Sequence, residues 1–129
     1  RRRIGEAVEM CRLGEFADVP VGSLSSGMRR RVALADAVML RPRILLLDDF
    51  LAGLDLASRR ACGEILSTAA QFSAVVATGH ELEDLAELSS KMLVLKDGAV
   101  AGVYESSGDA LASVRGIVDG GEISGEARS

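Results

Sequence analysis

Apolar residues recur at helical spacing in several stretches of the chain, and these stretches predict its helices. From Ile4 to Leu13 the apolar positions share one helical face, and Gly14 follows as a stop signal. The next helix is expected to end before Pro42, because a residue that precedes proline avoids helical angles. The full set of predicted helices covers residues 4–13, 25–40, 55–70, 81–88 and 109–118.

Two short apolar runs lack the alternation of a half-exposed strand. They are Ile44–Leu47 and Ser73–Thr78. Such runs are typical of strands that are buried on both faces of a parallel sheet. Two further apolar runs, Met92–Leu95 and Val100–Val103, flank Asp97-Gly98, a dipeptide that favours a tight hairpin turn.

The order of these elements predicts the architecture and the place of a ligand site. Alternating strands and helices favour an α/β fold with a mainly parallel sheet and an antiparallel hairpin at one edge. In such sheets ligands bind outside the carboxyl ends of the strands. Asp48-Asp49 follows the first predicted strand and Gly79-His80 follows the second. We expect these two loops to face the same crevice.

The composition is that of one ordinary globular domain. The 129 residues are 48% hydrophobic and 26% charged. The net charge of −4 and an aromatic content of 3% argue against a nucleic-acid partner. Two cysteines, Cys11 and Cys62, indicate a reducing compartment, and no apolar stretch has the length of a membrane span. The chain begins at Arg1 without a methionine, so we expect it to be a piece of a longer protein.

Adjacent carboxylates at a strand end are candidates for metal binding and acid–base chemistry. Asp48 offers the hard oxygen ligands that suit Mg²⁺, which proteins usually hold through one or two carboxylates and substrate phosphates. Asp49 beside it can orient or deprotonate an attacking water. The alternative is that both residues merely begin a loop and cap the next element of the chain.

The stretch Ser25-Ser26-Gly27-Met28 opens a predicted helix and is a candidate anion site. Free backbone N–H groups and the positive end of the helix dipole favour a phosphate there, the hydroxyls add donors, and Gly27 permits a close approach. Arg29–Arg31 follow at once, and their charge opposes the dipole, so a bound anion is one reason for their presence. The alternative is that Ser25 is a simple N-cap and the arginines form a solvated face.

His80 is the only histidine, and its place after a strand and a glycine directs it toward the predicted crevice. An imidazole there can donate a hydrogen bond to a terminal phosphate or to a polarised water. The alternative is a histidine without a chemical role.

Taken in order, these motifs resemble the second half of an ATP-binding cassette (ABC) transporter ATPase. Leu24–Asp55 is similar to the run that holds the family's signature motif, Walker B strand and D-loop. Gly79-His80 resembles its switch-histidine loop, and the hairpin around Asp97-Gly98 resembles the strand pair that comes after it. The resemblance covers residues 4–103. It implies a partial P-loop NTPase-type three-layer α/β fold, with residues 1–42 in the helical signature subdomain, 43–118 in the ATPase core and 119–129 in a flexible tail.

The resemblance also implies roles for individual residues at an ATP site. Asp48 would assist Mg²⁺, and Asp49 stands where the family has its catalytic glutamate. His80 would contact the γ-phosphate of ATP. Asp55, in the D-loop, would couple the two sites of a dimer.

The helix start would serve a second molecule. By resemblance, Ser25, Ser26 and Gly27, with Met28 in the same nucleotide-binding stretch, would bind ATP held by a partner cassette, in a homo- or heterodimer. A transmembrane permease subunit would be the other partner, and would hold the protein on the cytoplasmic face of the cell membrane. The cofactors implied are ATP and Mg²⁺, used for hydrolysis coupled to transport.

Two departures from the family pattern change the expected activity. No Gly-x-x-x-x-Gly-Lys-[Ser/Thr] occurs in the chain, so we expect that alone it neither binds ATP tightly nor hydrolyses it. Asp49 is one methylene shorter than glutamate, which retracts its carboxylate by roughly 1.5 Å. A misplacement near 1 Å can cost on the order of 10²-fold in rate.

Three other functions remain open at this point. One is a degenerate cassette that does not hydrolyse ATP and acts with a competent partner. Another is an ABC ATPase that works on soluble machinery rather than on transport. A third is a phospho-accepting receiver domain, which requires a further strand that ends in an aspartate, whereas the strand here runs into Ala77-Thr78-Gly79-His80.

Overall fold

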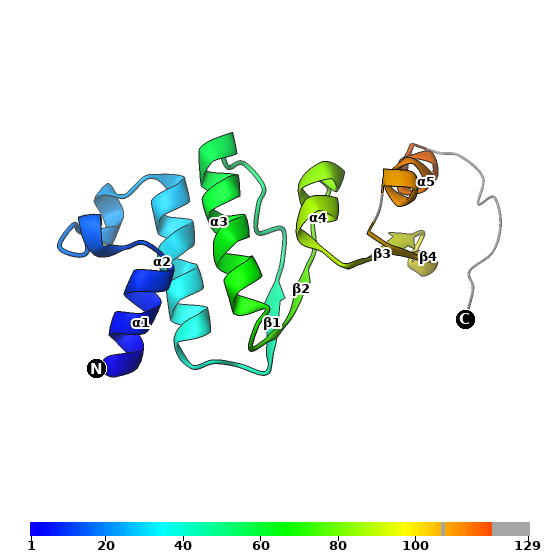
Figure 1. The fold of residues 1–129 in the computed structure, drawn as a ribbon. Coiled ribbons are helices and arrows are strands. Elements are labelled where there is room, and N and C mark those ends of the chain that lie inside the picture. The colour runs from blue at the N-terminus through cyan, green and yellow to red at the C-terminus, as the bar shows by residue number, and fades with distance from the viewer. Residues whose placement is uncertain (107, 120–129) are drawn as a thin grey trace. The chain divides into compact units, whose positions relative to one another are not determined.

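The first of two structural units, Arg1–His80, gathers three α-helices and two strands around one apolar core in the computed structural model (Figure 1). The structure describes residues 1–106 and 108–119. The elements of this unit are α1 (Arg2–Met10), the short 3₁₀ helices η1 (Gly14–Phe16) and η2 (Val21–Ser23), α2 (Ser26–Met39), β1 (Ile44–Leu47), α3 (Leu56–Ala69) and β2 (Ala74–Ala77). The three predicted helices and both strands are confirmed. The 3₁₀ helices lie where the sequence predicted only loop.

Helix α2 packs between α1 and α3, and α3 lies beside the strand pair (Figure 1). The core of this unit contains Leu34 from α2, Cys62 and Ile65 from α3, and Leu45 and Leu47 from β1. These side chains recur at helical spacing on the helices and at every second position on the strand. The pattern of buried positions therefore fixes which face of each element points inward.

The strands β1 and β2 pair in parallel, but they are not buried on both faces as the sequence predicted. Their register joins Leu47 to Ala77 at the carboxyl ends. Leu45 and Leu47 are buried, whereas Ile44 and Leu46 are 61% and 73% exposed. The prediction was wrong because a continuous apolar run indicates what a strand can pack against, not what is present to cover it. One face of this strand pair carries apolar side chains that no other element of the first unit covers.

The second unit, Glu81–Ser129, consists of two helices and a hairpin with a small core of its own. Its described elements are α4 (Leu82–Leu88), β3 (Lys91–Lys96), β4 (Ala99–Glu105) and α5 (Gly108–Val118). Asp97 and Gly98 have φ of 52° and 75°, the positive values that a tight hairpin turn of type I′ requires, so the predicted turn is confirmed. Of the predicted tail, residues 120–129 lie outside the described residues.

The described strands form an α/β protein with a parallel pair and an antiparallel hairpin, which confirms the predicted fold class. The hairpin forms a two-stranded sheet separate from β1 and β2. Met92 and Val94 of β3 are buried against α5 residues, including Val114, while Leu93 and Leu95 are exposed. None of the helices in the described part of the chain combines the length and apolar character needed to cross a bilayer.

Candidate functional site

The carboxyl ends of β1 and β2 bring Asp48, Asp49 and His80 to one edge of the strand pair, as the sequence predicted. The residue that joins them is Thr78, directly after β2. Its hydroxyl donates to Asp48 Oδ1 at 2.5 Å, and the backbone N–H of Asp49 donates to the same Thr78 Oγ1 at 3.0 Å. The parallel register explains this contact, because Leu47 pairs with Ala77 and the next residues on the two strands are Asp48 and Thr78.

The carboxylate of Asp49 faces the imidazole of His80. Asp49 Oδ1 lies 3.4 Å from His80 Nδ1, and the two side chains are 52% and 77% exposed. Asp49 also has a φ of +45°, a left-handed conformation that aspartate tolerates better than most residues. The site is therefore an open edge with an acid and a potential proton donor side by side, accessible to a ligand from solvent.

The chemistry of Asp48 fits the Mg²⁺ that the sequence resemblance implies. Its carboxylate is exposed at the edge of the strand pair, and one oxygen is held by the Thr78 hydroxyl. Carboxylate oxygens are hard ligands, which Mg²⁺ prefers either directly or through its bound waters. Asp48 would hold the ion, which would supply charge neutralisation to phosphate oxygens.

The start of α2 presents the two predicted serines to solvent. Ser25 is the N-cap, and its Oγ accepts a hydrogen bond from the N–H of Met28 at 3.2 Å. Ser25 and Ser26 are both exposed, whereas Met28 is half-buried and packs against the core. The helix start is thus accessible from outside, and the Ser25 hydroxyl satisfies one of the free donors of the first turn.

Gly27 has a structural reason to be glycine that the sequence did not reveal. It is buried, and a Cβ added there would lie only 2.7 Å from Cβ of Ser58 in α3. The absence of a side chain lets α2 and α3 approach closely at this point. Gly27 is therefore required for the close packing of α2 against α3, independently of any ligand that binds the neighbouring serines.

Asp55 is the N-cap of α3 and holds the same Ser58. The Ser58 N–H donates to Asp55 Oδ1 at 2.8 Å, and the Ser58 hydroxyl donates to Oδ2 at 3.2 Å. The backbone hydrogen bond, followed by the hydroxyl, lowers the pKa of the Asp55 carboxyl below its ordinary value. The predicted D-loop aspartate thus lies one side chain away from the start of α2.

The three arginines after the serine stretch have partners within the protein. Arg29 donates to the Leu24 carbonyl at 2.5 Å. The guanidinium of Arg30 lies 5.1 Å from the Phe50 ring centroid, and that of Arg31 lies 4.9 Å from the ring centroid of Phe16. These contacts give the arginines a packing role, so a bound anion is not needed to explain them.

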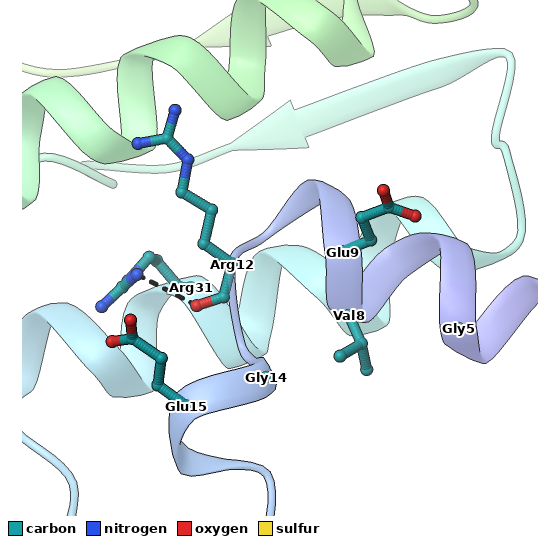
Figure 2. A pocket seen from close by; sticks show the side chains of 7 residues that line it. All are labelled: Gly5, Val8, Glu9, Arg12, Gly14, Glu15 and Arg31. Atoms are coloured by element: carbon teal, nitrogen blue, oxygen red, sulfur yellow. Dashed lines mark hydrogen bonds between the residues drawn. The ribbon is translucent and has the colours of Figure 1, made fainter.

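The first unit has a hollow of about 550 Å³ lined by Gly5, Val8, Glu9, Arg12, Gly14, Glu15 and Arg31 (Figure 2). Arg31 donates to the Arg12 carbonyl across it at 3.3 Å, and the Arg12 side chain pairs with Glu64 at 2.7 Å. Arg31 is the one lining residue from a stretch that the sequence analysis linked to a bound anion, and the lining includes none of the residues predicted to bind nucleotide or metal.

Sequence reasoning missed Thr78 and Ser58. The signal for Thr78 was a hydroxyl at the carboxyl end of the second strand, but its partner depends on strand register, which the sequence did not fix. The signal for Ser58 was its position three residues after a potential N-cap aspartate. Thr78 contacts Asp48 and Asp49, which are distant in sequence. Ser58 lies against Gly27 of another helix, and this contact depends on how the two helices pack.

The sequence is similar to known ATP-binding proteins of ABC transporters. The family model described as ABC transporter matches residues 1–52. An ABC transporter ATP-binding protein of Streptomyces coelicolor is 39% identical over 98 residues, which cover 76% of this chain and 37% of that protein. The cobalt import ATP-binding protein CbiO of Salmonella typhimurium is 36% identical over 100 residues, which cover 77% of this chain and 37% of that protein.

The fold is also similar to solved structures. The ADP conformation of an ATP-binding cassette of an ABC transporter superposes with a TM-score of 0.77 at 18% identity, over 88% of this chain and 44% of that one. The chain spans 37% of the length of the curated relatives named above. The fold is that of an α/β protein that matches ATP-binding cassette folds. The chain matches part of the ATP-binding proteins of the ABC transporter family.

Proposed function

We propose that this chain supplies part of an ATP-hydrolysing site in an ABC cassette that drives membrane transport. The observation that carries the proposal is the meeting of Asp48, Asp49 and His80 at one edge, with 3.4 Å between Asp49 Oδ1 and His80 Nδ1. An acidic strand end offers one carboxylate for a metal ion and another for the attacking water, two of the groups used in in-line attack on a phosphate. The imidazole beside it can donate a hydrogen bond to a phosphate. The sequence similarity to import ATP-binding proteins supports the same function.

Each residue at the edge has one proposed role. Asp48 would hold Mg²⁺ through water, and would thereby place charge neutralisation beside the phosphates. Asp49 orients the attacking water and accepts its proton. His80 donates a hydrogen bond to the terminal phosphate and stabilises the charge that develops there.

The start of α2 is proposed to act on the nucleotide of a second cassette, in a homo- or heterodimer. The exposed Ser25 and Ser26 offer hydroxyl groups at the positive end of a helix. Gly27 and Met28 continue this stretch, and the N–H of Met28 is held by Ser25 Oγ. Asp55, joined to Gly27 through Ser58, couples this helix start to the loop of its own site. In this assignment residues 1–42 belong to the helical signature subdomain and 43–118 to the ATPase core.

The remaining partners follow from the family. A transmembrane permease subunit receives the work of hydrolysis, and the cassette is peripheral on the cytoplasmic face of the membrane through that subunit. The names of the relatives that match this chain include the import of cobalt, spermidine/putrescine and molybdenum. This variety of cargo leaves the transported substrate outside the proposal.

Calorimetric titration with MgATP tests the proposal at the level of binding. The chain alone is expected to show no binding in the micromolar range, because it has no phosphate-binding loop sequence. The complete cassette, this chain joined to or assembled with a segment that carries such a loop, is expected to bind ATP. A complete cassette that binds no ATP would contradict the proposal.

A second candidate function is a cassette that binds ATP but turns it over slowly or not at all. It is favoured by Asp49, whose side chain is shorter than glutamate and faces His80. Asp49→Glu in the complete cassette distinguishes the two candidates. If the short side chain limits the rate, Asp49→Glu raises ATP hydrolysis by up to about 10²-fold. An unchanged or lower rate would show that the length of this side chain is not what limits turnover.

A further inference from the structure

We propose that Thr78 is a positioning residue, which holds Asp49 in the place where its carboxylate meets His80. The inference rests on the proposed function, because it concerns the residue that would orient the attacking water. Thr78 Oγ1 lies 2.5 Å from Asp48 Oδ1 and 3.0 Å from the backbone nitrogen of Asp49. One hydroxyl therefore contacts both members of the aspartate pair.

The direction of these two hydrogen bonds is fixed by chemistry. An ionised carboxylate only accepts hydrogen bonds, so the hydroxyl proton of Thr78 points to Asp48. The Thr78 oxygen is then left with lone pairs, and one of them accepts the N–H of Asp49. A residue without a hydroxyl can make neither contact, whereas serine can make both.

The bond to the Asp49 N–H acts at the point where the backbone is unusual. Asp49 has a φ of +45°, a conformation that needs local support in residues other than glycine. Its side chain is 52% exposed, so packing restrains it only in part. The direction of the carboxylate therefore depends also on the backbone, where Thr78 binds.

Thr78 also anchors the other side of the pair, because His80 follows it by two residues. The Thr78 N–H donates to the Leu47 carbonyl at 2.8 Å, which continues the parallel ladder past the end of β2. The loops that carry Asp49 and His80 are therefore both tied to one residue at the strand ends. The 3.4 Å distance between Asp49 Oδ1 and His80 Nδ1 is the result.

The chain itself offers a clean probe of this arrangement, because His80 is its only histidine. We would label histidine with ¹³C and record the Cε1–H cross-peak of this chain at one fixed pH, without nucleotide. Asp49→Asn defines the cross-peak position when the facing carboxylate is lost. Thr78→Val removes the hydroxyl with little change of shape, and Thr78→Ser keeps the hydroxyl. Thr68→Val is the matched control, since the Thr68 hydroxyl donates within α3 to the Glu64 carbonyl.

The expected result is a shift of the His80 cross-peak in Thr78→Val toward its position in Asp49→Asn. Thr78→Ser and the Thr68 control are expected to leave the cross-peak at its wild-type position. The Asp49 amide should exchange its hydrogen about tenfold faster in Thr78→Val, because it has lost its acceptor. Far-ultraviolet circular dichroism checks that each variant is folded, and Thr78→Ala is the second hydroxyl-free variant if Thr78→Val is not.

Two results would overturn the inference. One is a wild-type His80 cross-peak in the hydroxyl-free variants while Asp49→Asn moves it. The other is a cross-peak that Asp49→Asn does not move, since Asp49 would then not face His80 in solution. Neither measurement uses nucleotide, so a failure here leaves ATP binding by the complete cassette as a separate question. A failure to bind ATP would equally leave the role of Thr78 in holding Asp49 intact.

Discussion

At the scale of single residues, the contact of Gly27 with Ser58 leaves no room for a side chain at position 27. Alanine at position 27 would place a methyl group 2.7 Å from Ser58 Cβ, and Ser58 is fixed by two hydrogen bonds to Asp55. We expect Gly27→Ala to destabilise the chain by about 1–3 kcal/mol in urea unfolding, because α2 and α3 must move apart.

Gly5→Ala is the matched control for this substitution. Gly5 lies in α1, is exposed, and has open space where a Cβ would be added. The higher helix propensity of alanine is expected to stabilise the chain there by up to about 1 kcal/mol. Equal effects of the two substitutions would contradict the packing role assigned to Gly27.

The two cysteines are predicted to be unreactive in the folded chain. Cys11 and Cys62 are both fully buried. Burial, with a smaller contribution from Cys62 nearby, raises the pKa of the Cys11 thiol to about 11, and burial also raises the pKa of Cys62. At pH 8 a thiol-specific disulfide reagent should react about 10²-fold more slowly with the folded chain than with the chain in urea.

The same pKa shifts set the direction of the alkaline response. A thiol whose pKa is raised by folding stabilises the folded state below the pKa of the unfolded thiol. That stability is lost as the pH rises toward about 11, the folded pKa of Cys11. Rapid labelling of both thiols at pH 8 without denaturant would contradict their burial.

At the scale of elements, the N-cap residues of α2 and α3 differ in charge, so their contributions to stability should differ in pH dependence. Ser25 caps α2 with a neutral hydroxyl, while Asp55 caps α3 with a carboxylate. Ser25→Ala is expected to cost about 1 kcal/mol at any pH. Asp55→Asn is expected to destabilise the chain at neutral pH and progressively less under acid conditions.

The sign follows from the lowered pKa of Asp55. A carboxyl whose pKa falls on folding stabilises the folded state above its unfolded pKa, near 3.9 for aspartate, and loses this effect as the pH drops through the folded value. Urea unfolding of the wild type and of both variants at pH 7 and pH 3 measures this. A difference between wild type and Asp55→Asn that stays constant with pH would contradict the assignment.

Most elements of the fold could be predicted from the sequence, but their surroundings could not. Helical spacing and the limit at Pro42 located α2, and the Asp97-Gly98 turn located the hairpin. The meeting of Asp49 with His80 was expected from the rule for carboxyl ends of parallel strands. The bare face of β1 and the links through Thr78 could not be predicted, since they depend on register and on which layers are present.

At the scale of the whole molecule, the bare apolar face of β1 and β2 has a consequence in solution. Ile44, Leu46 and Val76 are each more than half exposed on this strand pair. Such a face favours association with other copies of the chain. Sedimentation is expected to show an average mass that rises with concentration.

Leu46→Lys tests the origin of this association, and Leu40→Lys is its matched control. Leu46 is 73% exposed on β1, and Leu40 is 69% exposed at the end of α2. Both substitutions therefore add one positive charge at a leucine of similar exposure. Leu46→Lys is expected to reduce association of the chain with other copies, whereas Leu40→Lys is expected to leave it unchanged. A wild-type chain that stays monomeric at high concentration would contradict the prediction.

The central claim, that the edge formed by Asp48, Asp49 and His80 carries ATP hydrolysis, is tested most directly by the rate of the complete cassette. His80→Ala is expected to lower the steady-state hydrolysis of MgATP by about 10²- to 10³-fold, as the loss of one donor to a transition state does. Gln71→Ala, an exposed change at the opposite end of the strands, is expected to keep the wild-type rate. Hydrolysis by His80→Ala at the wild-type rate would contradict the account.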